Sequence, residues 1–144
     1  MATMRPPMLS TVEKVLFLKS IDLFSQIPGE DLAAIALIST EERRDQQDEI
    51  FAEGESGDAL YLVIDGKVRV HKADRIIAEL GERECFGEMA ILDAAPRSAT
   101  VTAVSDTNLL KITREDFQEI MSEKPEIAQG IVKVLTRRLR DAIR

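Results

Sequence analysis

The chain has 144 residues, of which 44% are hydrophobic and only 4% aromatic, and its formal net charge at pH 7 is −7. This length and this apolar content suffice for one compact domain whose core is built mainly from aliphatic side chains. The negative charge argues against a nucleic acid partner, because surfaces that bind DNA or RNA depend on Lys and Arg. The sequence has no run of about twenty apolar residues, so we expect no direct membrane insertion.

The cysteine and histidine content argues against a disulfide-bonded protein and against a metal enzyme. Cys85 is the only cysteine, so the chain cannot form an internal disulfide, which is typical of a reducing compartment. We therefore expect a cytoplasmic location, either for a free protein or for the cytosolic part of a membrane protein. His71 is the only histidine, whereas a metal enzyme on a small barrel usually needs several imidazole ligands. We expect no metal site, no cofactor and no enzymatic activity.

Two helices are predicted within residues 10–39. The first begins at a capping box, in which Ser10 and Glu13 satisfy each other's backbone N–H groups. The second begins at Pro28, because the fixed φ of proline suits the first position of a helix.

Short strands separated by glycines are predicted between residues 40 and 112. The expected strands are the segments 41–46, 49–52, 60–64, 67–72, 75–80, 98–103 and 108–112. The dipeptide Asp65-Gly66 predicts a tight hairpin between two of them. Residues 53–58 contain two glycines, which favours a turn over a cation site. Regularly spaced short strands predict a small antiparallel barrel or jelly roll.

Two further helices are predicted after the strands. Thr113 caps the first of them, and Pro125 begins the second. Apolar residues recur at helical spacing along the second helix: Ile127, Ile131, Val134, Leu135 and Leu139.

These predicted elements describe one domain over residues 10–144. It comprises helices at 10–39, strands at 40–112 and helices at 113–144. Residues 1–9 are expected to be disordered or to form a junction.

The stretch of residues 86–101 brings together a carboxylate, a guanidinium and several small residues. Gly87 has no Cβ, so the backbone there can approach a ligand closely, and a short helix is predicted to begin at this glycine. The start of a helix presents N–H groups that suit an anion such as a phosphate. Arg97 offers a planar fork that fits two phosphate oxygens, and Glu88 is an acceptor that suits a sugar hydroxyl.

This stretch, FGEMAILDAAPRSATV, resembles the phosphate-binding cassette of the cyclic-nucleotide-binding domain family. It meets every fixed position of the family pattern F-G-E-x-A-x-x-x-x-x-P-R-x-A-T-V, and the resemblance covers about residues 16–140. The family includes regulatory subunits of the cyclic-AMP-dependent kinase, the catabolite activator protein and cyclic-nucleotide-gated channels. The resemblance implies a mainly β fold: an eight-stranded antiparallel jelly-roll barrel (double-stranded β-helix) with N-terminal helices and two C-terminal helices of the B/C type.

The resemblance also implies a ligand, cAMP or cGMP, and a role for each cassette residue. Ala90, Ser98 and Ala99 are expected to hold the phosphate through backbone N–H or hydroxyl groups. Arg97 is expected to pair with the phosphate charge, and Glu88 to bind the ribose hydroxyl.

The base pocket and its lid are also inferred from the family. Val70 is expected to line the base pocket, and the last helix to close over the base through Arg138 or Leu135. Ser98 leaves the base undecided, because members that bind cAMP and members that bind cGMP both carry a hydroxyl here. The expected ligand-binding residues are Val70, Phe86, Gly87, Glu88, Met89, Ala90, Arg97, Ser98, Ala99 and Arg138.

The expected function is that of a regulatory sensor, in which nucleotide binding moves the C-terminal helix. No effector domain or helix-turn-helix follows that helix, so we expect the domain to be part of a longer chain or to act on a partner protein. A homodimer is a further option. The alternative is an interaction or dimerisation module on the same fold that binds no ligand. In that case Glu88 and Arg97 would form only a structural ion pair.

Overall fold

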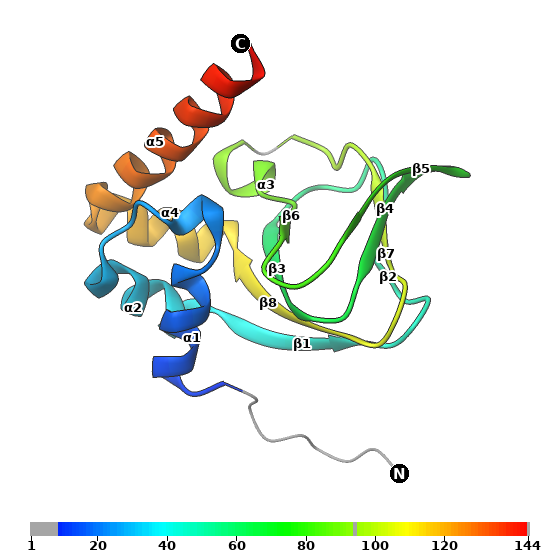
Figure 1. The fold of residues 1–144 in the computed structure, drawn as a ribbon, viewed down its shortest axis with the longest axis horizontal. Helices are drawn as coiled ribbons and strands as arrows, with labels where there is room; N and C mark the ends of the chain where they lie inside the picture. Colours follow the sequence, from blue (N-terminus) through cyan, green and yellow to red (C-terminus); the bar gives the residue numbers. More distant parts are fainter. Residues whose placement is uncertain (1–8, 94, 144) are drawn as a thin grey trace.

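Helices from both ends of the chain pack together on one side of a body of short β-strands (Figure 1). This computed structural model describes residues 9–93 and 95–143, so residues 1–8 of the expected junction lie outside the described residues. The helices are α1 (Thr11–Lys19), the 3₁₀-helix η1 (Asp22–Phe24), α2 (Gly29–Ile38), α3 (Met89–Leu92), α4 (Arg114–Glu123) and α5 (Pro125–Ala142). The strands are β1 (Thr40–Arg44), β2 (Glu49–Phe51), β3 (Ala59–Asp65), β4 (Val68–Lys72), β5 (Arg75–Leu80), β6 (Cys85–Phe86), β7 (Thr100–Ala103) and β8 (Thr107–Thr113).

Local capping groups set the helix starts much as the sequence predicts. Ser10 Oγ accepts a hydrogen bond from the Glu13 N–H at 3.1 Å, and Glu13 accepts one from the Ser10 N–H, which confirms the capping box. Thr113 caps α4 and Pro125 begins α5, as predicted. Pro28 is the N-cap of α2, so this helix begins one residue later than predicted. Within the ranges described, no helix combines the length and the apolar content needed to cross a lipid bilayer.

The strands form two four-stranded antiparallel sheets, ordered β1-β8-β3-β6 and β2-β7-β4-β5. The mainly β architecture with flanking helices is confirmed, but the predicted closure into a barrel is wrong. Among the described residues, no ladder of hydrogen bonds joins the edge strands of one sheet to those of the other. The edge strands β2 and β6 have three and two residues, and strands this short cannot continue the ladders around a closed barrel.

The turn after Asp65 does not form the predicted hairpin, because β3 and β4 belong to different sheets. Gly66 instead carries the chain from one sheet to the other, with a φ of +96°. A Cβ at this position would lie 2.6 Å from both the Asp106 carbonyl oxygen and Thr107 Oγ1. The glycine is thus required both by its left-handed backbone and by the close approach of the β7–β8 turn.

The strands next to the cassette also differ from their predicted bounds. The two-residue strand β6, which was not predicted, pairs with Tyr61 and Leu62 of β3. Strand β7 begins at Thr100, whereas a strand was predicted to begin at residue 98. Ser98 and Ala99 remain part of the cassette turn and do not enter the sheet.

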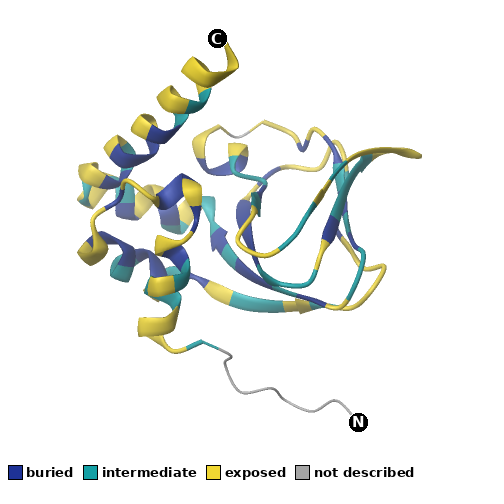
Figure 2. Cartoon of the chain, viewed as in Figure 1, coloured by how far each residue is buried: buried dark blue, intermediate teal, exposed yellow. Residues whose placement is uncertain are grey.

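Alternation along β3 and β8 divides the core into two clusters. Leu60 and Leu62 of β3 pack with the helices, whereas Tyr61 and Val63 of the same strand point between the sheets. Because β3 is buried on both faces, it separates the helical layer from the core between the two sheets (Figure 2).

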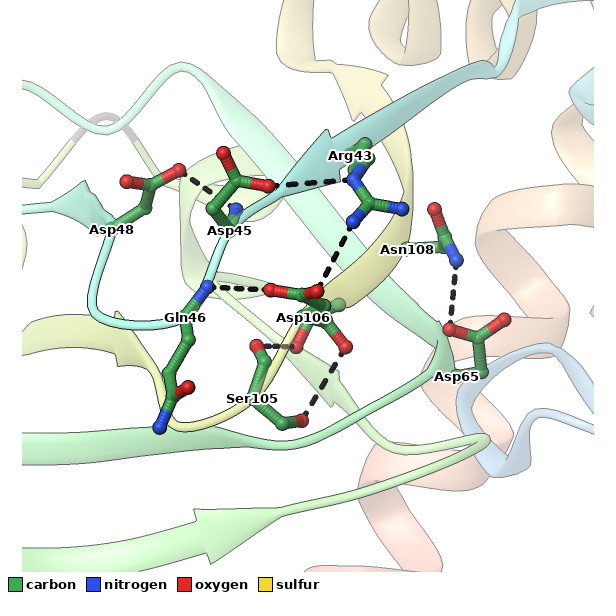
Figure 3. A network of polar contacts seen from close by, with 9 residues as sticks. Arg43, Asp45, Gln46, Asp48, Asp65, Ser105, Asp106 and Asn108 are labelled. Atoms are coloured by element: carbon green, nitrogen blue, oxygen red, sulfur yellow. Dashed lines mark hydrogen bonds and ion pairs between the residues drawn. The ribbon is translucent and has the colours of Figure 1, made fainter. Parts of the chain in front are cut away.

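The turns between β1 and β2 and between β7 and β8 are joined by polar contacts (Figure 3). Asp106 accepts hydrogen bonds from the Arg43 guanidinium at 3.1 Å and from the Gln46 N–H at 2.9 Å. The Asp45 N–H donates to Asp48, which closes the first turn. These contacts explain the acidic residues of the two turns as structural groups.

We expect Gly66→Ala to destabilise the fold by about 1–3 kcal/mol, because alanine at a positive φ is strained and its Cβ would meet the β7–β8 turn. Urea unfolding followed by circular dichroism would measure the loss. Gly29→Ala is the matched control, since a Cβ there has no neighbour within 4 Å. Equal stability of the two variants would contradict the requirement for glycine at position 66, where the chain crosses between the sheets.

Candidate ligand-binding site

A cavity of about 450 Å³ is enclosed by α3, by the segment that follows α3, and by residues of β2, β4, β5, β6 and β7. Every expected ligand-binding residue except Arg138 lines it: Val70, Phe86, Gly87, Glu88, Met89, Ala90, Arg97, Ser98 and Ala99. The fold therefore brings the cassette and Val70 of β4 to one place, although they are distant in the sequence.

Other residues complete the lining but were not predicted from the sequence. They are Phe51, Leu80, Cys85, Ala95, Pro96 and Val101. Strand alternation already placed one face of each strand inward. The strands that meet around the cavity are set by long-range pairing, such as that of Phe51 with Val101. No local sequence pattern predicts this pairing.

Gly87 does not begin a helix, and it leaves space beside Arg97. Its φ is +75°, which no helical residue adopts, so the prediction that a helix begins here is wrong and α3 begins at Met89. A Cβ on Gly87 would lie 2.6 Å from Nη1 of Arg97. The glycine thus makes room for the guanidinium. In addition, the Ala90 N–H, which was expected to hold the phosphate, donates to the Gly87 carbonyl oxygen at 3.0 Å.

Arg97 is buried, with 7% of its surface exposed, and it forms no ion pair with a described carboxylate. Its Nη2 donates to the Ala59 carbonyl oxygen at 2.8 Å, and its Nη1 to the Gly87 carbonyl oxygen at 3.4 Å. Its Nε is buried and has no hydrogen-bond partner in the described part of the chain. No ion pair joins it to Glu88 or to any other described acidic residue, so the structure does not contain the alternative ion pair.

The predicted turn at residues 53–58 holds the backbone of Arg97. The Gly54 N–H donates to the Arg97 carbonyl oxygen at 2.8 Å, and the Arg97 N–H donates to the Glu55 carbonyl oxygen at 2.7 Å. Gly57 lies close to the cassette, since an added Cβ would be 3.1 Å from Cβ of Ala90 and 3.3 Å from the Ala95 carbonyl oxygen. The turn therefore fixes the backbone of Arg97 and packs against the cassette.

Burial lowers the pKa of the Arg97 guanidinium from its ordinary value, and the nearby Tyr61, Asp58 and Glu55 oppose this shift. Removal from water makes an unneutralised cation unfavourable, by several kcal/mol in real proteins. An anion in the cavity would relieve that cost through charge-assisted hydrogen bonds.

Arg138 lies outside this cavity. It lines a smaller cavity of about 260 Å³ between η1, the β5–β6 turn and α5. Glu88 and Cys85 line both cavities and so form the wall between them. Leu135, the other expected lid residue, packs against the helical core.

Comparison with known proteins supports a shared fold and a shared cassette. The family model described as "Cyclic nucleotide-binding domain" matches residues 41–124. The "Cyclic AMP receptor protein" of Thermus thermophilus is 45% identical over 98 residues, which are 65% of this chain and 45% of that protein. A cyclic nucleotide-gated potassium channel of Rhizobium etli is 42% identical over 89 residues, 62% of this chain and 25% of the channel. The chain thus spans less than half the length of these relatives.

Solved structures also support the shared fold. The N-terminal domain of a transcriptional regulator from Streptomyces coelicolor superposes with a TM-score of 0.79 and 33% identity, covering 88% of this chain and 92% of that one. The regulatory domain of Toxoplasma gondii PKA, crystallised with cAMP, gives a TM-score of 0.72 and 32% identity, covering 76% of this chain and 44% of that one.

Cys85 contributes a thiol to the wall of the cavity. Burial, and next the charge of Glu88, raise the pKa of Cys85 from 9.0 to about 12. The thiol therefore stays protonated at neutral pH and behaves as a small apolar group.

We expect the folded protein to react with a thiol-specific disulfide reagent at pH 8 at least about 100-fold more slowly than the urea-unfolded chain, because the thiolate is the reacting species. The rate in the folded state should rise about tenfold per pH unit between pH 8 and 11. A rate that levels off near pH 9 would show that burial leaves the thiol unshifted.

Proposed function

Because this chain belongs to the cyclic nucleotide-binding domain family, we propose that it binds cAMP or cGMP in the cavity beside α3 and acts as a regulatory sensor. The observation that carries the proposal is the buried Arg97, which has no carboxylate partner and whose Nε lacks a hydrogen-bond partner within the described residues. A volume of about 450 Å³ lies within the ordinary range of small-ligand sites.

In this proposal each lining residue has a chemical task. Arg97 neutralises the cyclic phosphate and donates to its oxygens. Ser98 and Ala99 follow it along the cavity wall and present a hydroxyl and backbone N–H groups to the same phosphate. Glu88 accepts a hydrogen bond from the ribose hydroxyl. Val70 provides apolar surface for the base on the β4 side.

We propose further that movement of α5 relays binding to the rest of the protein. The close packing of α5 on the N-terminal helices supports this, because a Cβ on Gly130 would lie 2.7 Å from the Gln26 carbonyl oxygen. Asp22 of η1 forms ion pairs with two residues of α5, Arg137 and, at 3.0 Å, Arg138. The described residues of α5 do not line the ligand cavity, and its last turns extend away from the strands (Figure 1).

The ion pairs of Asp22 are therefore proposed to hold α5 in an open position. Partial burial raises the pKa of Asp22, but hydrogen bonds from Arg138 and Arg137 outweigh this and lower the pKa below 3.8. A carboxyl with a lowered folded-state pKa contributes stability above its ordinary value, and the contribution is lost as the pH falls through the lowered one. The contact is thus fully formed at neutral pH.

The second candidate function, an interaction or dimerisation module, is favoured by one observation. Val132 and Leu139 of α5 and its C-cap residue Ile143 are exposed and recur at helical spacing. Under either function we propose a non-catalytic domain in the cytoplasm. It would act on an effector in the same longer chain or on a partner protein, as the regulatory relatives suggest.

Isothermal calorimetry with cAMP and with cGMP is expected to show binding by the parent protein and a loss of at least about 30-fold in affinity for Arg97→Ala, because one partner of a buried charge pair is removed. Arg97→Lys keeps the charge without the fork and should fall between the two. Arg69→Ala is the control, since Arg69 is partly exposed, pairs with Glu79 and lies outside the cavity.

Two results would count against this assignment. No heat with either nucleotide at millimolar concentration would favour the interaction module. Equal affinity of the parent and Arg97→Ala would refute the role of Arg97.

Asp22→Asn is expected to raise nucleotide affinity about 1.4- to 5-fold, because exposed ion pairs contribute about 0.2–1 kcal/mol and this one favours the open position. Hydrogen exchange should also become faster in the last turns of α5. Asp141→Asn is the control, since Asp141 lies exposed near the end of α5 and makes no ion pair with a described residue. Unchanged affinity and exchange in Asp22→Asn would remove the support for the open-state contact.

A further inference from the structure

The guanidinium of Arg97 lies over an aromatic ring that the family pattern of the cassette does not include. Its Cζ is 3.9 Å from the centroid of the Phe51 ring. Both residues are buried, with exposed fractions of 7% for Arg97 and 9% for Phe51. We infer that Phe51 is a positioning residue, which holds Arg97 in its phosphate-binding orientation; this inference rests on the proposed function.

An aromatic ring can stabilise a cation without occupying its donors. The face of the ring is electronegative and attracts the guanidinium, most strongly where both groups are removed from water. A carboxylate at the same place would take the fork and compete with a phosphate for it. Arg97 has five N–H donors, and the two that bond to the Gly87 and Ala59 carbonyls leave three for an anion.

The ring is itself held from two sides. Phe51 lies in an aromatic cluster, with centroid distances of 6.1 Å to Tyr61 and 5.9 Å to Phe86. Tyr61 and Phe86 stack on each other at 5.2 Å, which fixes the far side of the cluster. Such contacts leave the Phe51 ring little freedom to rotate away from Arg97.

The backbone of β2 also directs the ring. Phe51 is paired with Val101 of β7, and the register shifts between Glu49 and Phe51. An irregularity of this kind re-aims the side chain that follows it. As a result, Phe51 enters the cavity wall beneath Arg97 and joins the ligand-lining residues.

These contacts complete a rigid support for one side chain. Carbonyl oxygens of Ala59 and Gly87 fix two corners of the guanidinium, and the ring of Phe51 covers one face. Nε, which has no hydrogen-bond partner among the residues that the structure describes, is the third nitrogen of the group. A receptor group that is already oriented loses little conformational freedom when its anion binds, so the ring would raise affinity through preorganisation.

A double-mutant cycle tests the inference, with cAMP and cGMP as probes in calorimetry. We expect Phe51→Leu to lower affinity about 5- to 30-fold in the parent background, and less than twofold in the Arg97→Gln background, because the ring acts through the guanidinium. Phe117→Leu, which removes a buried ring from the helical core, is the control and should destabilise the fold without changing affinity.

A second series separates electrostatics from packing. Replacing Phe51 by mono-, di- and trifluorinated phenylalanine weakens the negative face of the ring while nearly keeping its shape. Affinity is expected to fall stepwise, by about 3- to 10-fold in total, while the thermal unfolding midpoint stays within about 2 °C.

The outcomes distinguish the inference from the function on which it rests. If the parent binds and Arg97→Gln weakens binding, but Phe51→Leu and the fluorinated rings do not, the positioning role is wrong and the proposed function stands. Equal losses from Phe51→Leu in both backgrounds would also overturn it, because the ring would then act independently of Arg97. If the parent binds neither nucleotide, the proposed function fails and the inference fails with it.

Discussion

The burial of a guanidinium that has no ion-pair partner in the described part of the chain is the constraint on which the rest of the site depends. Arg97 is taken out of water and held by two carbonyl oxygens and one aromatic face, none of which carries a full negative charge. Such an arrangement is unfavourable for an isolated domain unless an anion completes it. The chain has 26 Asp and Glu residues, yet none of those that the structure describes forms an ion pair with this guanidinium.

The fold achieves this by bringing the continuous segment 53–59 against Arg97, where Gly87 of the cassette also lies. The turn at residues 53–58 bonds both backbone groups of Arg97, β3 supplies the Ala59 carbonyl, and Gly87 leaves the space that a side chain would fill. Because β3 is buried on both faces, the same strand fixes the helical layer behind it. The position of Arg97 is therefore fixed in part by a strand at the centre of the domain, although the cavity opens at the surface.

The helices at the two ends of the chain form a second unit, which shares a wall with the ligand cavity. Cys85 and Glu88 line both the larger cavity and the smaller one beside η1, and Arg138 reaches the smaller one from α5. Asp22 joins this corner to α5 through its pairs with Arg137 and Arg138. Glu88 therefore lies in the wall between the larger cavity and the corner where Asp22 meets α5.

Local chemistry allowed the sequence alone to predict the capping box at Ser10, the cap at Thr113 and most of the helices and strands in their order. The resemblance to a family pattern marked the cassette with Gly87, Glu88 and Arg97. Capping hydrogen bonds join residues three positions apart, and strand alternation has a period of two. Both depend only on nearby residues, so the sequence predicts them without knowledge of the fold. Only the tertiary structure decided that the sheets stay open, that Gly66 crosses between them, that Arg138 pairs with Asp22, and that Phe51 lies beneath Arg97. Each of these depends on which distant strands and helices meet, and that choice is made by packing of the whole chain and not by any local pattern.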